Sequence, residues 1–274
     1  MEYRAVRDQM GFLVTIPKNP SRIVSLVPSI TEFLHDIGLE NQIVGITKFC
    51  VHPKHYKSSK VIIGGTKNFK LDIIKKLNPD LILANKEEND KDRLLFLKNA
   101  GFPVWISDVK NIEEALDMMQ QIGIICNAEN ASVAIIKDLI KFKKWFKSPD
   151  TLIPSAYLIW RRPYMSINQD TFIHHMMRFC GLDNVFAQYP DRYPEISEED
   201  LKSAHPRLVI LSTEPYPFSE KHFPEIEDIL PDASLLLGDG DMFSWYGSRM
   251  ILAFEYFERI RKNIVEPLRK LWAI

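Results

Sequence analysis

The side chains best suited to chemistry in this sequence are charged and aromatic residues that follow predicted strands. Flat aromatic faces combined with a few fixed polar groups suit a large planar or chelated ligand. In the first half of the chain the candidates are Phe49, Lys67, Asn68 and Glu87. In the second half they are Trp160, Arg161, Tyr164, Glu214, Tyr216, Asp241, Trp245 and Tyr246. We expect these residues to contact a bound small molecule.

The two glutamates among these candidates permit a different interpretation. If Glu87 and Glu214 faced each other, they could serve as the acid and base of an enzyme. The sequence has no Gly-x-Gly-x-x-Gly segment, no phosphate-binding loop and no Gly-x-Ser-x-Gly nucleophile elbow. We therefore expect a protein without catalytic activity, and an enzyme of unknown reaction is the alternative.

Cys50 and His52 resemble half of a metal site. Sulfur and imidazole ligands favour zinc or another borderline ion, and Glu87 and Glu214 could complete the set. Protein metal sites usually have three or four ligands, and no partner is adjacent in the sequence. A protein that binds a metal ion directly is thus a third hypothesis, and an incidental pair is the simpler interpretation.

Composition excludes several classes of partner. The 274 residues are 46% hydrophobic, which suits a folded core, and 35 Lys and Arg nearly balance 36 Asp and Glu. The net charge of −1 gives no electrostatic reason to expect nucleic acid or an anionic membrane as a partner. Three widely spaced cysteines indicate no disulfide framework.

The first 22 residues contain several charges and no apolar run, so no secretory leader is predicted. No segment approaches the ~18 consecutive apolar residues of a membrane span. These features favour a cytoplasmic protein. A periplasmic protein whose leader has been removed is the alternative.

Short apolar runs alternate with helical patterns along the chain, and this order predicts mostly parallel sheets. A capping box from Ser29 to Glu32 is expected to begin the first helix, which Gly38 ends. A long segment without Gly or Pro, Glu129–Phe146, predicts one extended helix closed by Ser148-Pro149-Asp150. Strands are predicted at 23–27, 43–46, 61–63, 81–84, 104–107, 156–160, 165–168, 208–212 and 235–237. Further helices are predicted at 71–77, 90–99, 112–121, 172–179, 198–204, 220–229 and 250–260.

The two halves of the chain resemble each other. Residues 72–87 align with 199–214 without a gap, so that Asp72 matches Glu199 and Glu87 matches Glu214. A second similarity links the Gly-Leu pairs that begin at Gly38 and Gly181. We therefore predict a duplicated α/β fold with one lobe at 1–127, a connecting helix at 128–148 and a second lobe at 149–274. Because ligands bind beyond the carboxyl ends of parallel strands, we expect the ligand in a cleft between the lobes.

Several segments resemble a known family. Arg22-Ile-Val-Ser-Leu-Val-Pro-Ser-Ile-Thr-Glu32, Val44-Gly45 and Asn78-Pro-Asp-Leu-Ile-Leu83 are similar to the periplasmic binding proteins of cobalamin, haem and iron-siderophore ABC importers. The segment from Asp241 to Met250 resembles a ligand-contacting loop of the cobalamin-binding members. The likeness runs from about Arg22 to the C-terminus.

The resemblance implies two Rossmann-like lobes joined by a single long backbone helix. It implies a monomer with no tightly bound cofactor, whose ligand is cobalamin, haem or an iron-siderophore. By position, Phe49 and Trp245 match ligand contacts of the family. Asp72 and Glu199 match the acidic pair, one on each lobe, that docks on arginines of the ABC permease. The segments Cys50–His52 and Lys86–Asn89 depart from the family pattern and suggest a subfamily with its own ligand.

Overall fold

The computed structural model describes residues 2–146 and 151–271. The chain divides into two compact units. The first consists of Met1–Ile140 and Tyr246–Arg249, and the second of Lys141–Trp245 and Met250–Ile274. Each unit has its own parallel sheet, so the predicted α/β class with two lobes is confirmed.

The first unit is built on a five-stranded sheet with the order β5-β4-β3-β6-β7, in which all neighbours are parallel. Strands β3, β6 and β7 are buried at every residue, as expected where helices cover both faces. The strands are β3 (Ile23–Ser25), β4 (Ile43–Ile46), β5 (Val61–Ile62), β6 (Leu81–Asn85) and β7 (Val104–Ser107).

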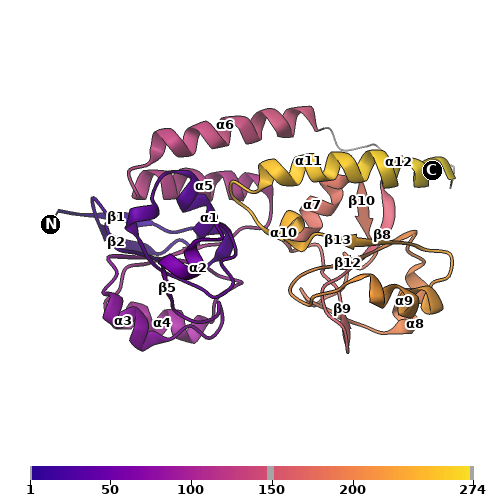
Figure 1. Ribbon diagram of the computed structural model, residues 1–274, viewed down its shortest axis with the longest axis horizontal. Coiled ribbons are helices and arrows are strands. Elements are labelled where there is room, and N and C mark those ends of the chain that lie inside the picture. The colour runs from indigo at the N-terminus through magenta and orange to yellow at the C-terminus, as the bar shows by residue number, and fades with distance from the viewer. Residues whose placement is uncertain (1, 147–150, 272–274) are drawn as a thin grey trace. The chain divides into compact units, whose positions relative to one another are not determined.

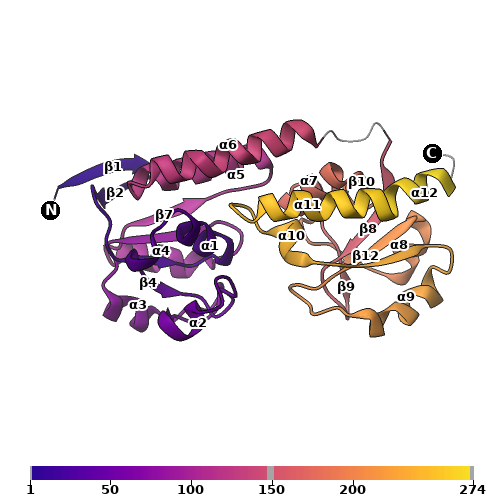
Figure 2. The ribbon, with the colours of Figure 1, turned by 45° about the horizontal axis from the view of Figure 1, so that its top comes forward.

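Helices cover both faces of this sheet, with α1 and α5 on one side and α3 and α4 on the other (Figures 1 and 2). Asp90 accepts a hydrogen bond from the Arg93 N–H and so caps α4, and Asn111 caps α5 in the same way. The helices are α1 (Pro28–Asp36), α2 (Tyr56–Ser59), α3 (Leu71–Leu77), α4 (Lys91–Asn99) and α5 (Ile112–Ile125), with a 3-10 turn at Glu40–Gln42.

An antiparallel hairpin of β1 (Tyr3–Arg7) and β2 (Leu13–Pro17) precedes the first sheet. The sequence did not predict it, because Arg4 and Arg7 place charges in β1 and because β2 is a run of only five residues that ends in Pro17. The turn uses Gly11 at a φ of 85°. The hairpin reaches the edge strand β7 through a hydrogen bond from the Gln9 N–H to the Ile106 carbonyl at 3.1 Å.

The second unit repeats this plan with a four-stranded parallel sheet in the order β10-β8-β12-β13. The strands are β8 (Ile153–Leu158), β10 (Leu182–Asn184), β12 (Leu208–Ser212) and β13 (Ser234–Gly238). A separate antiparallel pair joins β9 (Tyr164–Met165) to β11 (Glu195–Ile196).

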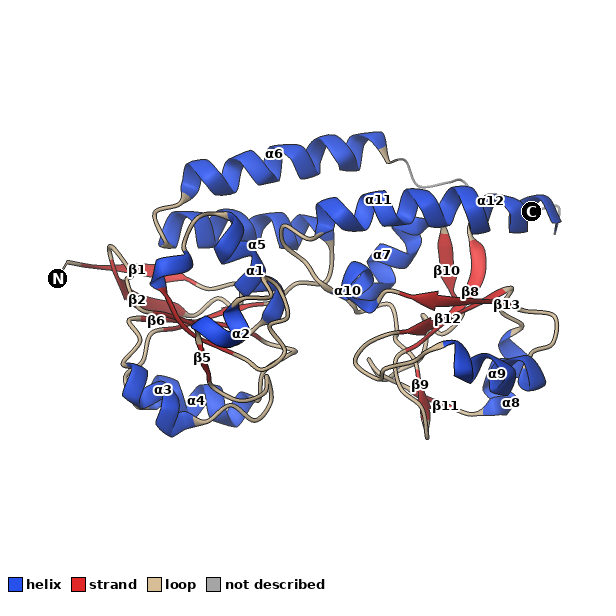
Figure 3. Ribbon diagram, viewed as in Figure 1, coloured by secondary structure: helices blue, strands red, loops and turns tan. Residues whose placement is uncertain are grey.

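Helices α7 and α11 lie on one face of the second sheet, and α8 and α9 lie on the other (Figure 3). No helix among residues 2–146 and 151–271 is long and apolar enough to cross a bilayer. The helices are α7 (Phe172–Cys180), α8 (Glu198–Ala204), α9 (Phe223–Ile229), α10 (Gly240–Ser244), α11 (Met250–Ile260) and α12 (Glu266–Leu271). A 3-10 turn at Glu220–His222 and a π-helical turn at Arg261–Val265 complete the unit.

The internal repeat extends to the backbone. Helix α3 and strand β6 have the same lengths and spacing as α8 and β12. Both helices end on a non-glycine residue in the left-handed region, Asn78 with a φ of 45° and His205 with a φ of 44°. The strand order β4-β3-β6-β7 matches β10-β8-β12-β13, and this agreement supports duplication.

The long predicted helix is α6 (Glu129–Trp145), which ends one residue before the predicted end. Its residues up to Ile140 belong to the first unit and the rest to the second. It packs closely on α5, because a Cβ at Gly123 would lie 2.5 Å from the Ser132 Cβ. The predicted closing segment Ser148-Pro149-Asp150 lies outside the described residues.

One predicted cap is wrong. Helix α1 begins at Pro28 with Val27 as its N-cap, and no side chain caps it. Proline occupies the first helical position because its missing N–H needs no partner there. Thr31 bonds the Val27 carbonyl instead, at 2.9 Å.

Candidate functional site

The buried amide of Asn89 joins three strand ends of the first unit. Its Oδ1 accepts from the Asn85 N–H at 2.8 Å, and its Nδ2 donates to the carbonyls of Leu26 at 3.1 Å and Thr66 at 3.0 Å. These partners lie at or just beyond the ends of β6, β3 and β5. One side chain therefore links the loops that carry Lys67, Asn68 and Glu87.

The turn that holds Glu87 is organised by a second amide. Asn85 Oδ1 accepts from the N–H groups of Glu87 at 2.8 Å and Glu88 at 3.0 Å. Lys67 Nζ donates to the Glu87 carbonyl. Two predicted site residues, Lys67 and Glu87, are thus brought together.

Glu88 lies in the Lys86–Asn89 segment that the sequence singled out, but it was not among the predicted ligand contacts. The hydroxyl of Tyr246 donates to Glu88 Oε1 at 3.1 Å, and both residues belong to the first unit. Burial raises the pKa of Glu88 to about 7, with a further contribution from the neighbouring Glu87 charge. Two adjacent acidic residues directly after a buried strand were the available signal.

Phe49 follows β4 and is 50% exposed, with the Lys48 ammonium 4.9 Å from its ring centroid. The ring is therefore available to a ligand. Asn68 is exposed, and its side chain folds over Gly65, where a Cβ would lie 2.3 Å from Asn68 Oδ1.

The proposed metal pair gains no support from its surroundings. Cys50 is fully buried, and its Sγ lies 3.2 Å from the Thr31 hydroxyl and 3.4 Å from that of Thr47. Burial raises the pKa of the Cys50 thiol, whereas metal binding requires the thiolate. Within the described part of the chain, no three His, Cys, Asp or Glu side chains are grouped to hold a metal ion.

In the second unit an exposed aromatic surface follows β8. Trp160 is 41% exposed, and its ring stands edge-to-face on Tyr216 with 5.6 Å between the ring centroids. Tyr216 in turn packs on the buried Phe218 at 4.7 Å. These three residues form what we call the aromatic shelf. Its outermost ring is that of Trp160, which packs on Tyr216 along one side.

Arg161 and Tyr164 converge on one carboxylate beside this shelf. Arg161 Nε donates to Glu225 Oε2 at 3.0 Å, and the Tyr164 hydroxyl donates to Glu225 Oε1. The Arg161 guanidinium holds the pKa of Glu225 below its ordinary value. Glu225, on α9, was not predicted, because it is distant in sequence from both partners.

Glu214 positions Trp245 within the second unit. Its Oε1 accepts from the Trp245 indole N–H at 3.0 Å and from the Ser244 hydroxyl. The approach requires Gly240, because a Cβ there would lie 2.3 Å from the Glu214 Cγ. Trp245 is only 6% exposed, so it offers little surface to a ligand in this conformation. The predicted residue Asp241 lies in α10, where its carbonyl accepts from the Trp245 N–H at 3.0 Å.

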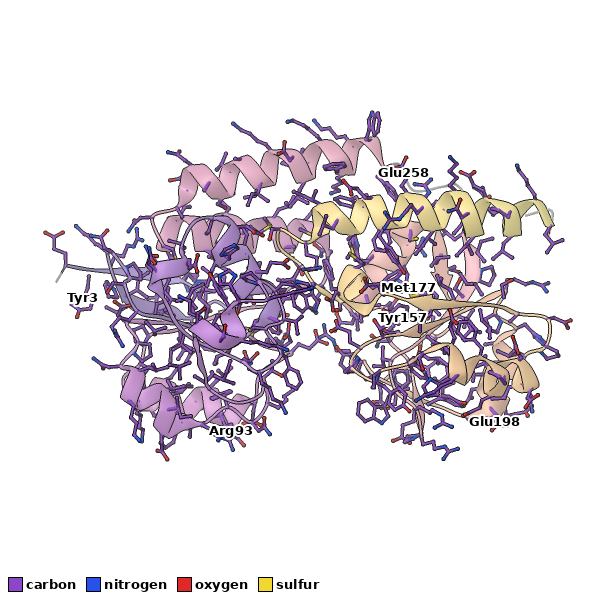
Figure 4. The ribbon with its side chains drawn as sticks, in the orientation of Figure 1. Tyr3, Arg93, Tyr157, Met177, Glu198 and Glu258 are labelled. Carbon is purple, nitrogen blue, oxygen red and sulfur yellow. The ribbon has the colours of Figure 1, made fainter. Side chains whose placement is uncertain are left out.

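The two acidic residues expected to dock on a permease occupy equivalent places. Asp72 is the second residue of α3, and Glu199 is the second residue of α8. Both are exposed. Glu198, next to Glu199, is drawn at the surface of the second unit, whereas Tyr157 and Met177 lie inside it (Figure 4).

Two α/β units with parallel sheets of equivalent order, and with aromatic and charged residues beyond the strand ends, define a two-lobed binding protein. Comparison with protein families identifies the family of binding proteins. The profile described as periplasmic binding protein matches residues 23–230, and the chain belongs to this family.

Two individual relatives and one solved structure are similar to most of the chain. A vitamin B12-binding protein of Pectobacterium carotovorum is 23% identical over 240 residues, which cover 85% of this chain and 86% of the relative. An uncharacterized ABC transporter substrate-binding lipoprotein of Bacillus subtilis is 27% identical over 207 residues, covering 72% of this chain and 65% of the relative. The crystal structure of a periplasmic heme-binding protein of Pseudomonas aeruginosa superposes with a TM-score of 0.75 at 18% identity, covering 88% and 92% of the two chains.

The role of Asn89 can be tested by its replacement. Asn89→Ala should lower the free energy of unfolding of the first unit by about 2–4 kcal/mol, because three backbone groups, two of them buried, lose their partner. Asn99→Ala, at an exposed residue of α4, serves as control and should change the free energy of unfolding by less than about 0.5 kcal/mol. Urea unfolding measures both, and equal stabilities would show that the strand ends do not depend on this amide.

The raised pKa of Glu88 predicts a pH dependence. The stability contributed by protonation is fully present below the unfolded pKa of 4.5 and is lost as the pH rises through about 7. Glu88→Gln keeps an acceptor for Tyr246 and should remove this loss. Above pH 7 its free energy of unfolding should exceed that of the parent protein by on the order of 2–3 kcal/mol. Urea midpoints between pH 4.5 and 8 measure the effect, with the exposed Glu129→Gln as control. Parallel pH profiles for Glu88→Gln and the parent protein would contradict it.

Proposed function

We propose that this protein binds a corrinoid or a porphyrin-type metal chelate and delivers it to an ABC importer. Membership of the periplasmic binding protein family supports a substrate-binding role. The names of the relatives, which include vitamin B12 and heme binders, favour a chelate as the ligand. The chelate is cargo, and its metal arrives with it.

The observation that carries the proposal is the exposed, oriented ring of Trp160 next to Arg161. Tyr216 holds the indole edge-to-face, which leaves a flat apolar surface for a macrocycle. Glu225 fixes the Arg161 guanidinium, which has five N–H donors and can still face a carboxylate or phosphate on the ligand. An aromatic surface beside a fixed cation suits a planar ligand with anionic side groups.

The first unit is proposed to contribute Phe49, Lys67 and Asn68. Phe49 offers a half-exposed ring, and the two polar residues lie on one loop whose end Asn89 fixes. Glu214 is proposed to hold Trp245 in place rather than to contact the ligand freely, because its carboxylate accepts the hydrogen bond of the indole N–H.

The family favours the periplasmic alternative over the cytoplasmic one that the N-terminal sequence suggested. Its members are binding proteins for transport, which argues against the alternative of an enzyme that uses Glu87 and Glu214. The monomeric state and the cleft between the lobes stay predictions.

Removal of the outer ring of the shelf tests ligand binding. Trp160→Ala should weaken the binding of cyanocobalamin or haemin by about fivefold to thirtyfold, since an aromatic contact is worth on the order of 1–2 kcal/mol. Titration followed by ligand absorbance gives the dissociation constants. Trp145→Ala, which removes an 85% exposed indole from α6, is the matched control and should bind like the parent protein.

Two outcomes would reject the assignment. If neither chelate binds the parent protein saturably, the ligand class is wrong. If Trp160→Ala and Trp145→Ala bind equally well, the aromatic shelf is not the contact surface. Circular dichroism of each variant checks that the fold is retained.

We further propose that Asp72 and Glu199 contact the permease. The double change Asp72→Lys and Glu199→Lys should leave chelate affinity unchanged and reduce uptake of the labelled chelate at least tenfold, because two attractive charges become repulsive at the contact. Uptake is measured in cells that lack their own copy of the gene. Glu258→Lys, an exposed charge reversal on α11, is the control. Normal uptake by the double variant would exclude this contact.

A further inference from the structure

A cavity of about 720 Å³ lies in the first unit, apart from every predicted ligand contact. One wall is the hairpin, through Phe12, Leu13 and Val14. The opposite walls are α4, through Leu94 and Leu95, and the β7 edge of the sheet. Its volume falls within the range of about 300–1,000 Å³ that is usual for small-molecule sites.

The charged groups that line the cavity are all lysines, Lys86, Lys91 and Lys98, and no acidic residue lines it. Asp108 pairs with Lys86 at 2.7 Å, and Asp8 lies 3.7 Å from Lys98. No described residue forms an ion pair with Lys91, the first residue of α4. An apolar chamber with an uncompensated ammonium at its wall is complementary to an apolar chain that ends in one negative charge.

Large apolar side chains around the cavity face solvent. Leu13 is 67% exposed, Phe12 is 56% exposed and Leu95 is 45% exposed. Contiguous exposed apolar residues of this kind usually mark a surface that binds something. A flat surface of a second copy would cover them but would leave the chamber empty, and voids of this size are rare in packed interfaces.

This cavity is separate from the substrate site of the family. The hairpin lies before residue 23, where the match to the family begins. None of Phe49, Lys67, Asn68 or Glu87 lines the cavity. An occupant of this site is therefore independent of the chelate proposed above.

We propose that the cavity binds a single-chain amphipathic anion of the long-chain fatty acid class. The acyl chain lies between the hairpin and α4 against Leu94 and Leu95, and the carboxylate pairs with Lys91. Each methylene removed from the chain should weaken binding about fourfold while the chain stays within the cavity.

Isothermal titration of the full chain with dodecanoate, below its micelle concentration, tests the proposal. Saturable binding of one equivalent is expected, with decanoate about 15-fold weaker. Dodecanol, which has the same chain without the charge, should bind about twofold to fivefold more weakly than dodecanoate.

Substitutions at Lys91 and Leu95 locate the site. Lys91→Gln should abolish the preference for dodecanoate over dodecanol and leave dodecanol affinity unchanged. Leu95→Asp should weaken dodecanoate binding at least tenfold more than the isosteric Leu95→Asn, since only the former adds a negative charge. Lys76→Gln, an exposed residue of α3 outside the cavity, is the control and should leave the affinity for both ligands unchanged.

Other results would overturn the proposal. One is that dodecanoate does not bind saturably. Another is that Leu95→Asp and Leu95→Asn weaken dodecanoate binding equally. A third is that the protein sediments as a dimer and Leu95→Asp dissociates that dimer. The chelate proposal is tested separately, because Trp160→Ala should keep dodecanoate binding and Leu95→Asp should keep cyanocobalamin binding.

Discussion

The buried amide of Asn89 is the contact on which the arrangement of the first unit depends. Parallel strands place their carboxyl ends along one edge, but the loops that leave this edge diverge unless a side chain holds them. Asn89 can do so because an amide accepts and donates at once, and its bonds reach Asn85, Leu26 and Thr66. Glu87, Glu88 and Lys67 inherit their positions from this network. An aspartate at 89 would lack the donors, and a leucine would leave three backbone groups without partners.

In the second unit other side chains hold the strand ends. Ser212 replaces Asn85 at the end of the equivalent strand, and its hydroxyl accepts from Tyr157 at 3.0 Å and donates to the Glu214 carbonyl at 2.6 Å. Glu214 then holds Ser244 and Trp245 through its carboxylate. Duplication thus preserved helix length, strand length and the left-handed residue between them, whereas the side chains that fix the strand ends changed. Two different sets of anchors therefore leave different side chains at the strand ends of the two units.

The sequence predicted what depends on local pattern. Helices α3, α8 and α11 and strands β7 and β12 have the predicted bounds, because Pro, Asn and Gly punctuate clear apolar periods. The site was predicted less completely, since a strand-end rule finds Trp160 and Glu214 but not their partners. Glu225 lies 64 residues from Arg161, and Asn89 joins three loops that only tertiary structure brings together. The pattern also could not distinguish an exposed ring, Trp160, from a buried one, Trp245, because both follow strands of the same sheet.

The missed hairpin explains a difference between the two sheets. Strands β7 and β13 are equivalent edge strands, yet β7 is buried at all four residues and β13 is only half-buried at four of its five. Open sheet edges expose unpaired backbone groups, and proteins commonly cover them. In the first unit the end of β1 does this, because Gln9 bonds Ile106 and the Trp105 indole N–H donates to the Arg7 carbonyl at 3.3 Å. The hairpin is fixed to β7 at this end, while Phe12 and Leu13 extend over α4. The cavity with its lysines is therefore a consequence of how the first unit protects its edge.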